Sequence, residues 1–230
     1  MAVGMLSYLQ VHTQPDISMA VHQTSRFFND PRLSHEKASM GLVRYLFGTR
    51  TRGIVYNPNK SKGLKCYVDA DFTGGWTQAD SDNAENVMSQ TGYVIAYAVC
   101  PINCVSKLQT EIALSIAEAE YIALSQSLRE LIPLMNFLEE INKTFPILLG
   151  APNFICTVHK DNQYYIKMAK SPKFSPRTKH IALKYHHFRS FVKFDRVIIK
   201  YCRTEMQKAD LLTKPLNNHI FFRLYYMLLG

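Results

Sequence analysis

Apolar residues recur at helical spacing over the first sixty residues and then change to strand-like runs. The early spacing predicts one helix over residues 16–28, with Asp16 as its cap, and a second helix from Ser34 to a stop at Gly48. Residues 57–63 (NPNKSKG) have the composition of a turn. We therefore expect a boundary there, between a helical segment and a second unit.

The second unit begins with strands. Residues 64–69, 92–99 and 103–108 are rich in β-branched and aromatic residues, and we expect the second and third of these segments to pair as a hairpin. The polar residues 74–90 between the first two strands predict a loop. Two further apolar runs, residues 154–158 and 197–201, predict a fourth and a fifth strand.

A long helix is predicted between the third and fourth strands. Residues 115–118 (SIAE) have the form of a capping box, and an apolar stripe follows at helical spacing. Pro133 lies within that stripe and predicts a kink or a split. Shorter helices are expected at residues 162–169, 183–194, 209–212 and 221–229. The order βββαβαβα indicates an α/β fold, with a mixed sheet flanked by helices.

Composition excludes several classes of protein. Apolar residues make up 47% of the 230 residues, so general disorder is excluded. No apolar run approaches the ~18 residues of a membrane helix, and the start MAVGMLSYLQ lacks the basic region of a signal peptide. Five cysteines, an odd number, indicate free thiols in a reducing, intracellular compartment. Cys100 and Cys104 are four residues apart, but no second pair follows at zinc-finger spacing, so buried thiols are the simpler interpretation.

Charge is divided between two regions of the chain. Residues 69–140 contain 11 acidic residues and two basic ones, a net charge of −9, whereas residues 167–208 contain 12 basic and two acidic residues, a net charge of +10. A metal-dependent nuclease uses both kinds of region, because carboxylates hold the cations and basic side chains hold the phosphates. Two unrelated solvated faces are an equally simple interpretation of the charge alone.

Four acidic residues fall at the edges of predicted elements. Asp69 lies in the first strand, Glu120 heads the apolar stripe of the long helix, Asp161 ends the fourth strand and Asp210 begins a short helix. Asp71 follows Asp69 on the same strand face. Carboxylates from several elements can hold two Mg²⁺ ions for phosphodiester hydrolysis. Taken singly, Asp161 and Asp210 are more simply interpreted as helix caps and Glu120 as a first-turn residue. The four residues together, in the order βββαβαβα, favour the metal site.

Glu118 is the alternative to Glu120 on the same predicted helix. It aligns with Ser125 and Arg129 and fits a cap on a more polar face. We therefore take Glu120 as the candidate ligand.

Six collinear motifs resemble the ribonuclease H domain of copia-type LTR retrotransposon Pol polyproteins: YVDADF (67–72), AEAEYIALSQS (117–127), KDNQ (160–163), SPRTKHI (175–181), YHHFR (185–189) and ADLLTKPL (209–216). Upstream, QPDISMAVHQTSRFF (14–28), HEKA (35–38) and RYLFGTRTRGIVY (44–56) resemble the end of the reverse transcriptase in the same polyproteins. The resemblance covers nearly the whole chain.

This resemblance implies a ribonuclease H-like fold with a five-stranded mixed sheet, preceded by a small helical remnant of reverse transcriptase. The implied domains are residues 1–60, the ribonuclease H-like domain 63–216 and a helical tail 217–230. The implied metal site takes Asp69, Glu120, Asp161 and Asp210 as catalytic ligands of two Mg²⁺ ions, for which Mn²⁺ can substitute.

The implied reaction is endonucleolytic hydrolysis of the RNA strand of RNA–DNA hybrids. Lys173, Arg177, Lys179, His180 and Lys184 are the expected nucleic-acid contacts, with His186 and His187 nearby. The implied partners are the hybrid and the rest of a polyprotein, without a membrane or a small-molecule cofactor. A cytoplasmic particle or the nucleus is the expected location.

Two features favour an alternative, a degenerate or co-opted fragment that binds nucleic acid without cutting it. The chain contains no Tyr-x-Asp-Asp polymerase motif, so we expect no polymerase activity. Tyr164 and Tyr165 also stand where the family usually has small residues.

Overall fold

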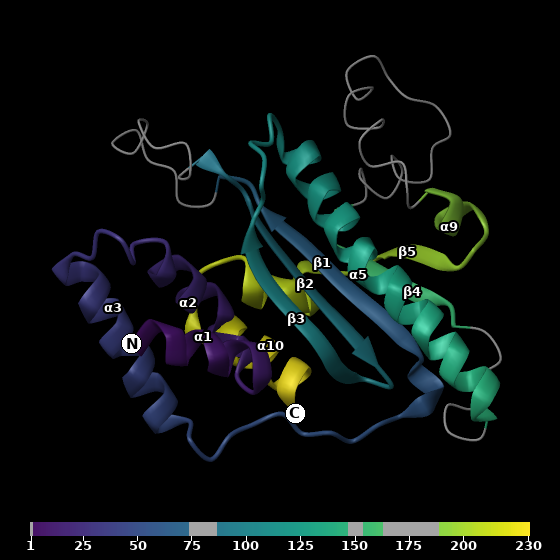
Figure 1. The fold of residues 1–230 in the computed structure, drawn as a ribbon, viewed down its shortest axis with the longest axis horizontal. Helices are drawn as coiled ribbons and strands as arrows, with labels where there is room; N and C mark the ends of the chain where they lie inside the picture. The colour runs from purple at the N-terminus through teal and green to yellow at the C-terminus, as the bar shows by residue number, and fades with distance from the viewer. Residues whose placement is uncertain (1, 74–86, 147–153, 163–188) are drawn as a thin grey trace.

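A five-stranded mixed sheet forms the centre of the protein (Figure 1). The computed structural model describes residues 2–73, 87–146, 154–162 and 189–230. The strands are β1 (Leu64–Asp71), β2 (Gln90–Tyr97), β3 (Cys100–Leu108), β4 (Cys156–Lys160) and β5 (Val197–Tyr201), in the order β3-β2-β1-β4-β5. β2 is antiparallel to both of its neighbours, β1 and β3, whereas β4 pairs parallel with β1 and with β5. The predicted ribonuclease H-like α/β fold is confirmed.

One face of the sheet is covered by helix α5 (Ile116–Thr144), which runs alongside β1 in Figure 1. Its N-cap is Ser115, whose hydroxyl accepts a hydrogen bond of 3.1 Å from the Glu118 amide. The predicted stripe is buried against alternate residues of β1, β4 and β5, which are Cys66, Val68, Cys156, Val158, Val197 and Ile199. The helix continues through Pro133, so the predicted split is wrong. Packing of the stripe on both sides of Pro133 holds the two halves in one helix.

The opposite face is covered by the short 3₁₀-helix η7 (Lys208–Leu212) and by α10 (Asn218–Leu229). Val94 of β2 packs there against Leu212, Tyr225 and Leu228 in a second apolar cluster. The Val55 amide donates a hydrogen bond of 2.7 Å to the Leu229 carbonyl, which ties the C-terminal helix to the segment before β1.

Beside this face lies a helical unit made of α1 (Ala2–His12), η1 (Pro15–Ile17), α2 (Ser18–Ser25) and α3 (Leu33–Gly48). Leu6, Ile17 and Val21 form its core. The helix predicted over residues 16–28 is shorter than expected, because Asp16 lies in η1 and is buried there instead of capping a helix. Tyr45 of α3 contacts Phe221 of α10 edge-on, with ring centroids 6.0 Å apart.

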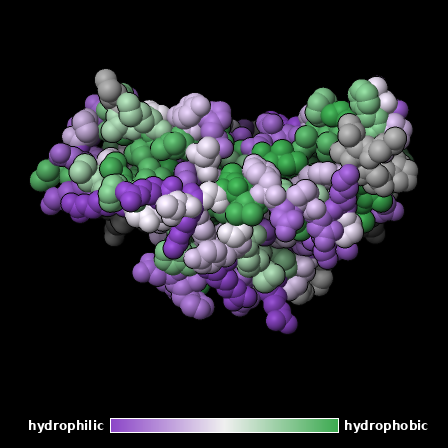
Figure 2. Space-filling view, turned by 90° about the horizontal axis from the view of Figure 1, so that it is seen from below, coloured by the Kyte–Doolittle hydropathy of each residue, from purple (hydrophilic) through white to green (hydrophobic). Residues whose placement is uncertain are grey.

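The helical unit carries exposed apolar side chains, visible as green patches at the left of Figure 2. They include Met5 and Val11 on α1 and Val43 and Phe47 on α3. The proposed division into residues 1–60, 63–216 and 217–230 stays a prediction. Within the described residues, no helix has the length and apolar character needed to cross a membrane.

Several predicted boundaries are displaced. The strand predicted to reach Val99 ends at Tyr97, because Ala98 and Val99 form a tight hairpin turn with φ of 53° and 70°. The third strand begins at Cys100 instead of residue 103, and the fourth covers Cys156–Lys160 instead of 154–158.

The remaining described elements are η2 (Lys60–Lys62), η6 (Thr204–Met206) and α9 (Arg189–Lys193), which is the end of the helix predicted over residues 183–194. The start of that helix and almost all of the one predicted over 162–169 lie outside the described residues. All five cysteines are free; Cys66, Cys100 and Cys156 are buried, as predicted, whereas Cys104 and Cys202 are half-buried.

Candidate active site

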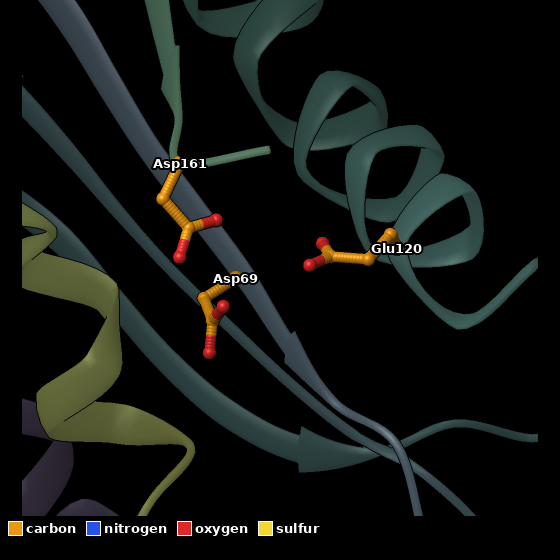
Figure 3. A group of neighbouring side chains, drawn as sticks. All are labelled: Asp69, Glu120 and Asp161. Atoms are coloured by element: carbon orange, nitrogen blue, oxygen red, sulfur yellow. The ribbon is translucent and has the colours of Figure 1, made fainter. Parts of the chain in front are cut away.

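Three carboxyl groups converge at one end of the sheet (Figure 3). Asp69 lies near the end of β1, Asp161 directly follows β4, and Glu120 lies in the first turns of α5. One carboxylate oxygen of each residue lies within 4.8 Å of the others. Because β1 and β4 are parallel neighbours, their carboxyl ends meet at the same edge of the sheet. This edge therefore collects negative charge from three separate elements.

Glu120 is buried and paired with a buried cation. The Lys160 ammonium donates to the Glu120 carboxylate and lies 3.3 Å from the Glu120 carbonyl oxygen. The Lys160 side chain is only 1% exposed. Burial raises the pKa of Glu120, and the Lys160 charge opposes that shift. A buried pair of this kind holds the Glu120 carboxylate in one place at the head of the helix.

A second lysine joins Asp69 to the fourth acidic residue, Asp210. The Lys214 ammonium lies 3.1 Å from Asp69 Oδ2 and 3.3 Å from Asp210 Oδ1. The Thr213 hydroxyl donates a further hydrogen bond to Asp69. Burial together with the Asp69 charge raises the pKa of Asp210 to about 7, although Lys214 opposes the shift.

The pKa of Lys214 responds in the opposite direction. Burial alone would lower it, but the charges of Asp69 and Asp210 outweigh burial and raise it. Lys214 is therefore a fixed positive charge between two carboxylates.

Close packing of η7 on β2 places Asp210 and Thr213 beside Asp69. Gly92 pairs with Asp69 in the β1–β2 ladder, and a Cβ at Gly92 would lie 2.5 Å from Thr213 Cγ2. Only glycine allows this approach. The Ser106 hydroxyl also donates a hydrogen bond of 2.6 Å to the Leu212 carbonyl, which anchors the end of η7 to β3.

The start of α5 is fixed by a buried amide. Gln109 Nε2 donates hydrogen bonds to the Thr91 hydroxyl at 3.1 Å and to the Ala119 carbonyl at 2.7 Å. These bonds tie the residue before Glu120 to β2. Both ends of the acidic group are thus held by the sheet.

The donor set suits a hard divalent cation. Mg²⁺ and Mn²⁺ prefer carboxylate oxygens, and Asp69, Glu120 and Asp161 offer three such groups within reach of one ion. Asp210 is linked to Asp69 by the Lys214 ammonium, which contacts both carboxylates. No other group of three or more metal-ligating side chains occurs in the part of the chain that the structure describes.

The structure places the four predicted ligands as follows. It brings Asp69, Glu120 and Asp161 together and sets Asp210 next to Asp69. Glu118 instead accepts a hydrogen bond of 2.8 Å from the Leu114 amide, as its predicted capping position requires. Asp71 ends β1 half-buried, where burial raises its pKa. The predicted nucleic-acid contacts all lie outside the described residues, as do the nearby histidines and tyrosines: Lys173, Arg177, Lys179, His180, Lys184, His186, His187, Tyr164 and Tyr165.

Sequence reasoning missed Lys160, Thr213 and Lys214. Lys160 directly precedes Asp161, and strand alternation points it toward α5, opposite to a solvent-facing position. Lys214 follows Asp210 by four residues, a spacing at which opposite charges pair on a helical turn. These two spacings indicate which lysines could pair with the carboxyl groups, but the contacts themselves depend on how the elements pack.

No protein-family model matches this chain. Curated relatives do match it. The retrovirus-related Pol polyprotein from transposon TNT 1-94 of Nicotiana tabacum is 36% identical over 220 residues, which are 96% of this chain and 15% of that protein. The corresponding polyprotein from transposon RE1 of Arabidopsis thaliana is 33% identical over 95% of this chain and 14% of that protein. The chain belongs to the copia-type Pol polyprotein family.

This Pol-family chain spans about one seventh of the length of these relatives. Among solved structures, LC11-RNase H1 from compost aligns with a TM-score of 0.44 and 17% identity, over 66% of this chain and 92% of that protein. The Pol family and the sheet topology together identify a ribonuclease H-type domain.

Proposed function

We propose that this chain is a divalent-metal-dependent ribonuclease that cleaves the RNA strand of RNA–DNA hybrids. The observation that carries the proposal is the convergence of Asp69, Glu120 and Asp161 within 4.8 Å at the carboxyl edge of the sheet. Asp210 beside them supplies the fourth carboxylate. Membership of the Pol polyprotein family supports the same activity.

The carboxylates would hold Mg²⁺ or Mn²⁺, and a bound ion supplies an activated water and stabilises the departing oxygen. The chain's own residues keep the ligands in position. Lys160 fixes Glu120, and Thr213 with Lys214 fixes Asp69. The products are a 3′-hydroxyl and a 5′-phosphate, because water attacks phosphorus and the 3′ oxygen leaves.

A groove beside the acidic group supports contact with a nucleic-acid backbone. It has a volume of about 620 Å³ and is lined by Tyr201, Arg203, Thr204, Glu205, Met206 and Arg223. Its lining residues Tyr201 and Arg203 flank Cys202, whose thiol pKa is raised to about 12 by burial and by the charges of Asp161 and Asp210. The groove therefore adjoins the acidic group. The guanidinium groups of Arg203 and Arg223 in this groove are suited to bind phosphates next to the cleaved bond.

The groove is tested by replacing both arginines. We expect Arg203→Ala/Arg223→Ala to weaken hybrid binding by about 10-fold and to flatten its salt dependence, since two phosphate contacts are lost. Fluorescence anisotropy at several salt concentrations measures both effects. The variant Arg44→Ala/Arg129→Ala removes the same charge from exposed positions on α3 and α5. Equal weakening by both variants would attribute the effect to net charge instead of the groove.

The central experiment is cleavage of a labelled RNA–DNA hybrid with Mg²⁺ or Mn²⁺, beside an Asp161→Asn control purified in the same way. Asp161 is half-exposed at the end of β4, so the amide replacement leaves the fold intact. We expect metal-dependent cleavage that the control lacks. Labelled RNA duplex and DNA duplex, tested in parallel, establish the requirement for a hybrid.

The pairing of Glu120 with Lys160, and of Asp69 and Asp210 with Lys214, favours a second candidate. Two ammonium groups already neutralise part of the negative charge of the acidic group. The second candidate function is therefore binding of nucleic acid without cleavage. A folded protein that binds the hybrid and leaves it intact with either metal would establish this second function.

A further inference from the structure

The two lysines of the acidic group differ in burial. The Lys160 side chain is 1% exposed and belongs to the packed interior. The Lys214 side chain is 31% exposed, so its charge can be removed without opening a cavity in the core. Lys214 is therefore the lysine whose charge can be tested separately from the stability of the fold.

Lys214 also stands in a position that a cation favours. Its ammonium lies 3.1 Å from Asp69 Oδ2, 3.2 Å from Asp69 Oδ1 and 3.3 Å from Asp210 Oδ1. It thereby joins the only predicted ligand outside the three-carboxylate group to that group. A divalent ion shared by Asp69 and Asp210 would meet the positive charge of Lys214 directly.

The net charge of the candidate ligands and their lysines indicates how many divalent ions the free protein can neutralise. Asp69, Glu120, Asp161 and Asp210 carry four negative charges when ionised, and Lys160 and Lys214 return two positive charges. The remaining charge of −2 matches one divalent cation. Asp69, Glu120 and Asp161 are the three ligands close enough to share that ion.

We propose that Lys214 acts as a built-in cation between Asp69 and Asp210, so that the free protein binds one divalent ion and not two. This proposal rests on the proposed metal site and refines it. Lys214 is a positioning residue, since it acts through the two carboxylates. Loss of its charge opens a second ion site at Asp69 and Asp210.

The test counts bound ions and does not depend on activity. Mn²⁺ is titrated into the full chain at pH 8, and free Mn²⁺ is measured by electron paramagnetic resonance. We expect one ion per chain in the wild type and two in Lys214→Met, which keeps the unbranched stem but removes the charge. Lys214→Gln provides a second neutral variant if the methionine variant does not fold, as judged by circular dichroism.

Three controls separate charge from other effects. Lys214→Arg keeps the positive charge and should bind one ion. Lys143→Met removes a lysine whose side chain is 73% exposed on α5, and should also bind one. Adding Asp210→Asn to Lys214→Met should return the count to one, because the second site loses a ligand.

Each remaining outcome has a definite meaning. Two ions in the wild type, or one ion in both neutral Lys214 variants, would overturn the proposal while the proposed nuclease function stands. A wild-type protein that binds no Mn²⁺ would overturn the metal site itself, and with it both proposals.

Discussion

Two regions of this protein bury carboxyl groups, and they stabilise them by different means. In the N-terminal helical unit, Asp16 is 5% exposed and accepts a hydrogen bond from the Tyr45 hydroxyl. Its other oxygen has no hydrogen-bond partner among the described residues. At the end of the sheet, Glu120 and Asp69 are equally buried but are each paired with a lysine.

This difference indicates that Asp16 has a structural role, whereas the carboxyl groups at the end of the sheet form a candidate functional site. Burial raises the pKa of Asp16, and hydrogen bonds from the Tyr45 hydroxyl and from the Asp16 backbone, both neutral, oppose that shift, so the group is tolerated inside a small helical core. At the sheet end, like charges lie within 4.8 Å of one another, which lowers stability unless cations compensate. Packing does not require such clustering, and perturbed groups gathered in this way are typical of functional sites.

The largest effect expected from breaking this arrangement comes from Lys160→Met. Removing the ammonium leaves the Glu120 carboxylate buried without its cation. We expect the free energy of unfolding to fall by about 3–5 kcal/mol, the usual cost of breaking a buried ion pair from one side. Urea denaturation followed by circular dichroism measures it.

A double variant provides the control for that prediction. Adding Glu120→Gln removes the uncompensated charge, so Lys160→Met/Glu120→Gln should recover a large part of the lost stability. If the double variant is less stable than Lys160→Met alone, the lost stability comes from packing of the lysine stem, and the charge pair is not its cause.

A smaller change in the free energy of unfolding is expected from replacing one glycine in each region. In Gly92→Ala the new Cβ would lie 2.5 Å from Thr213 Cγ2 and 3.0 Å from the Ala209 carbonyl, so η7 must move away from β2. We expect a loss of about 1–3 kcal/mol, as is usual for overpacking. Because the displaced Thr213 donates a hydrogen bond to Asp69, Mn²⁺ affinity should fall as well, which calorimetry measures.

Gly41→Ala in α3 is the matched substitution. Its Cβ would meet nothing within 4 Å, and alanine is the better helix former, so we expect a gain of about 0.5–1 kcal/mol with unchanged Mn²⁺ binding. Equal stability changes in the two variants would contradict the close approach of η7 to the sheet.

The order of the elements could be predicted from the sequence because an element that buries one face repeats apolar residues at a fixed spacing. The apolar stripe predicted α5 and the apolar run predicted β5, whose bounds match the predicted residues 197–201. The strand predicted through Val99 failed for a local reason. Val99 is β-branched and favours strands, but the hairpin requires it at φ 70°, a conformation that composition does not reveal.

The acidic residues of the site could be found from the sequence, but their partners were not. An acidic residue at the end of a predicted strand can be recognised from its position in the sequence alone. Whether a nearby lysine points into the same site depends on how β4, η7 and α5 meet, which is a tertiary property. The burial of Asp16 was missed for the same reason, since Tyr45 lies 29 residues away.

The smallest expected effect tests the structural carboxyl group. Tyr45→Phe removes the hydrogen bond to Asp16, and we expect a loss of about 1 kcal/mol at pH 7. The folded pKa of Asp16 is raised by burial, so Asp16 contributes stability below its ordinary value of 3.8 and loses it as the pH rises through the raised value. Tyr45 lowers that folded pKa, so its removal should matter little near pH 4 and increasingly toward pH 7. Urea unfolding at both pH values measures the difference, and a loss that is the same at both would show that Tyr45 stabilises the unit by packing on Phe221 and not by holding the Asp16 carboxylate.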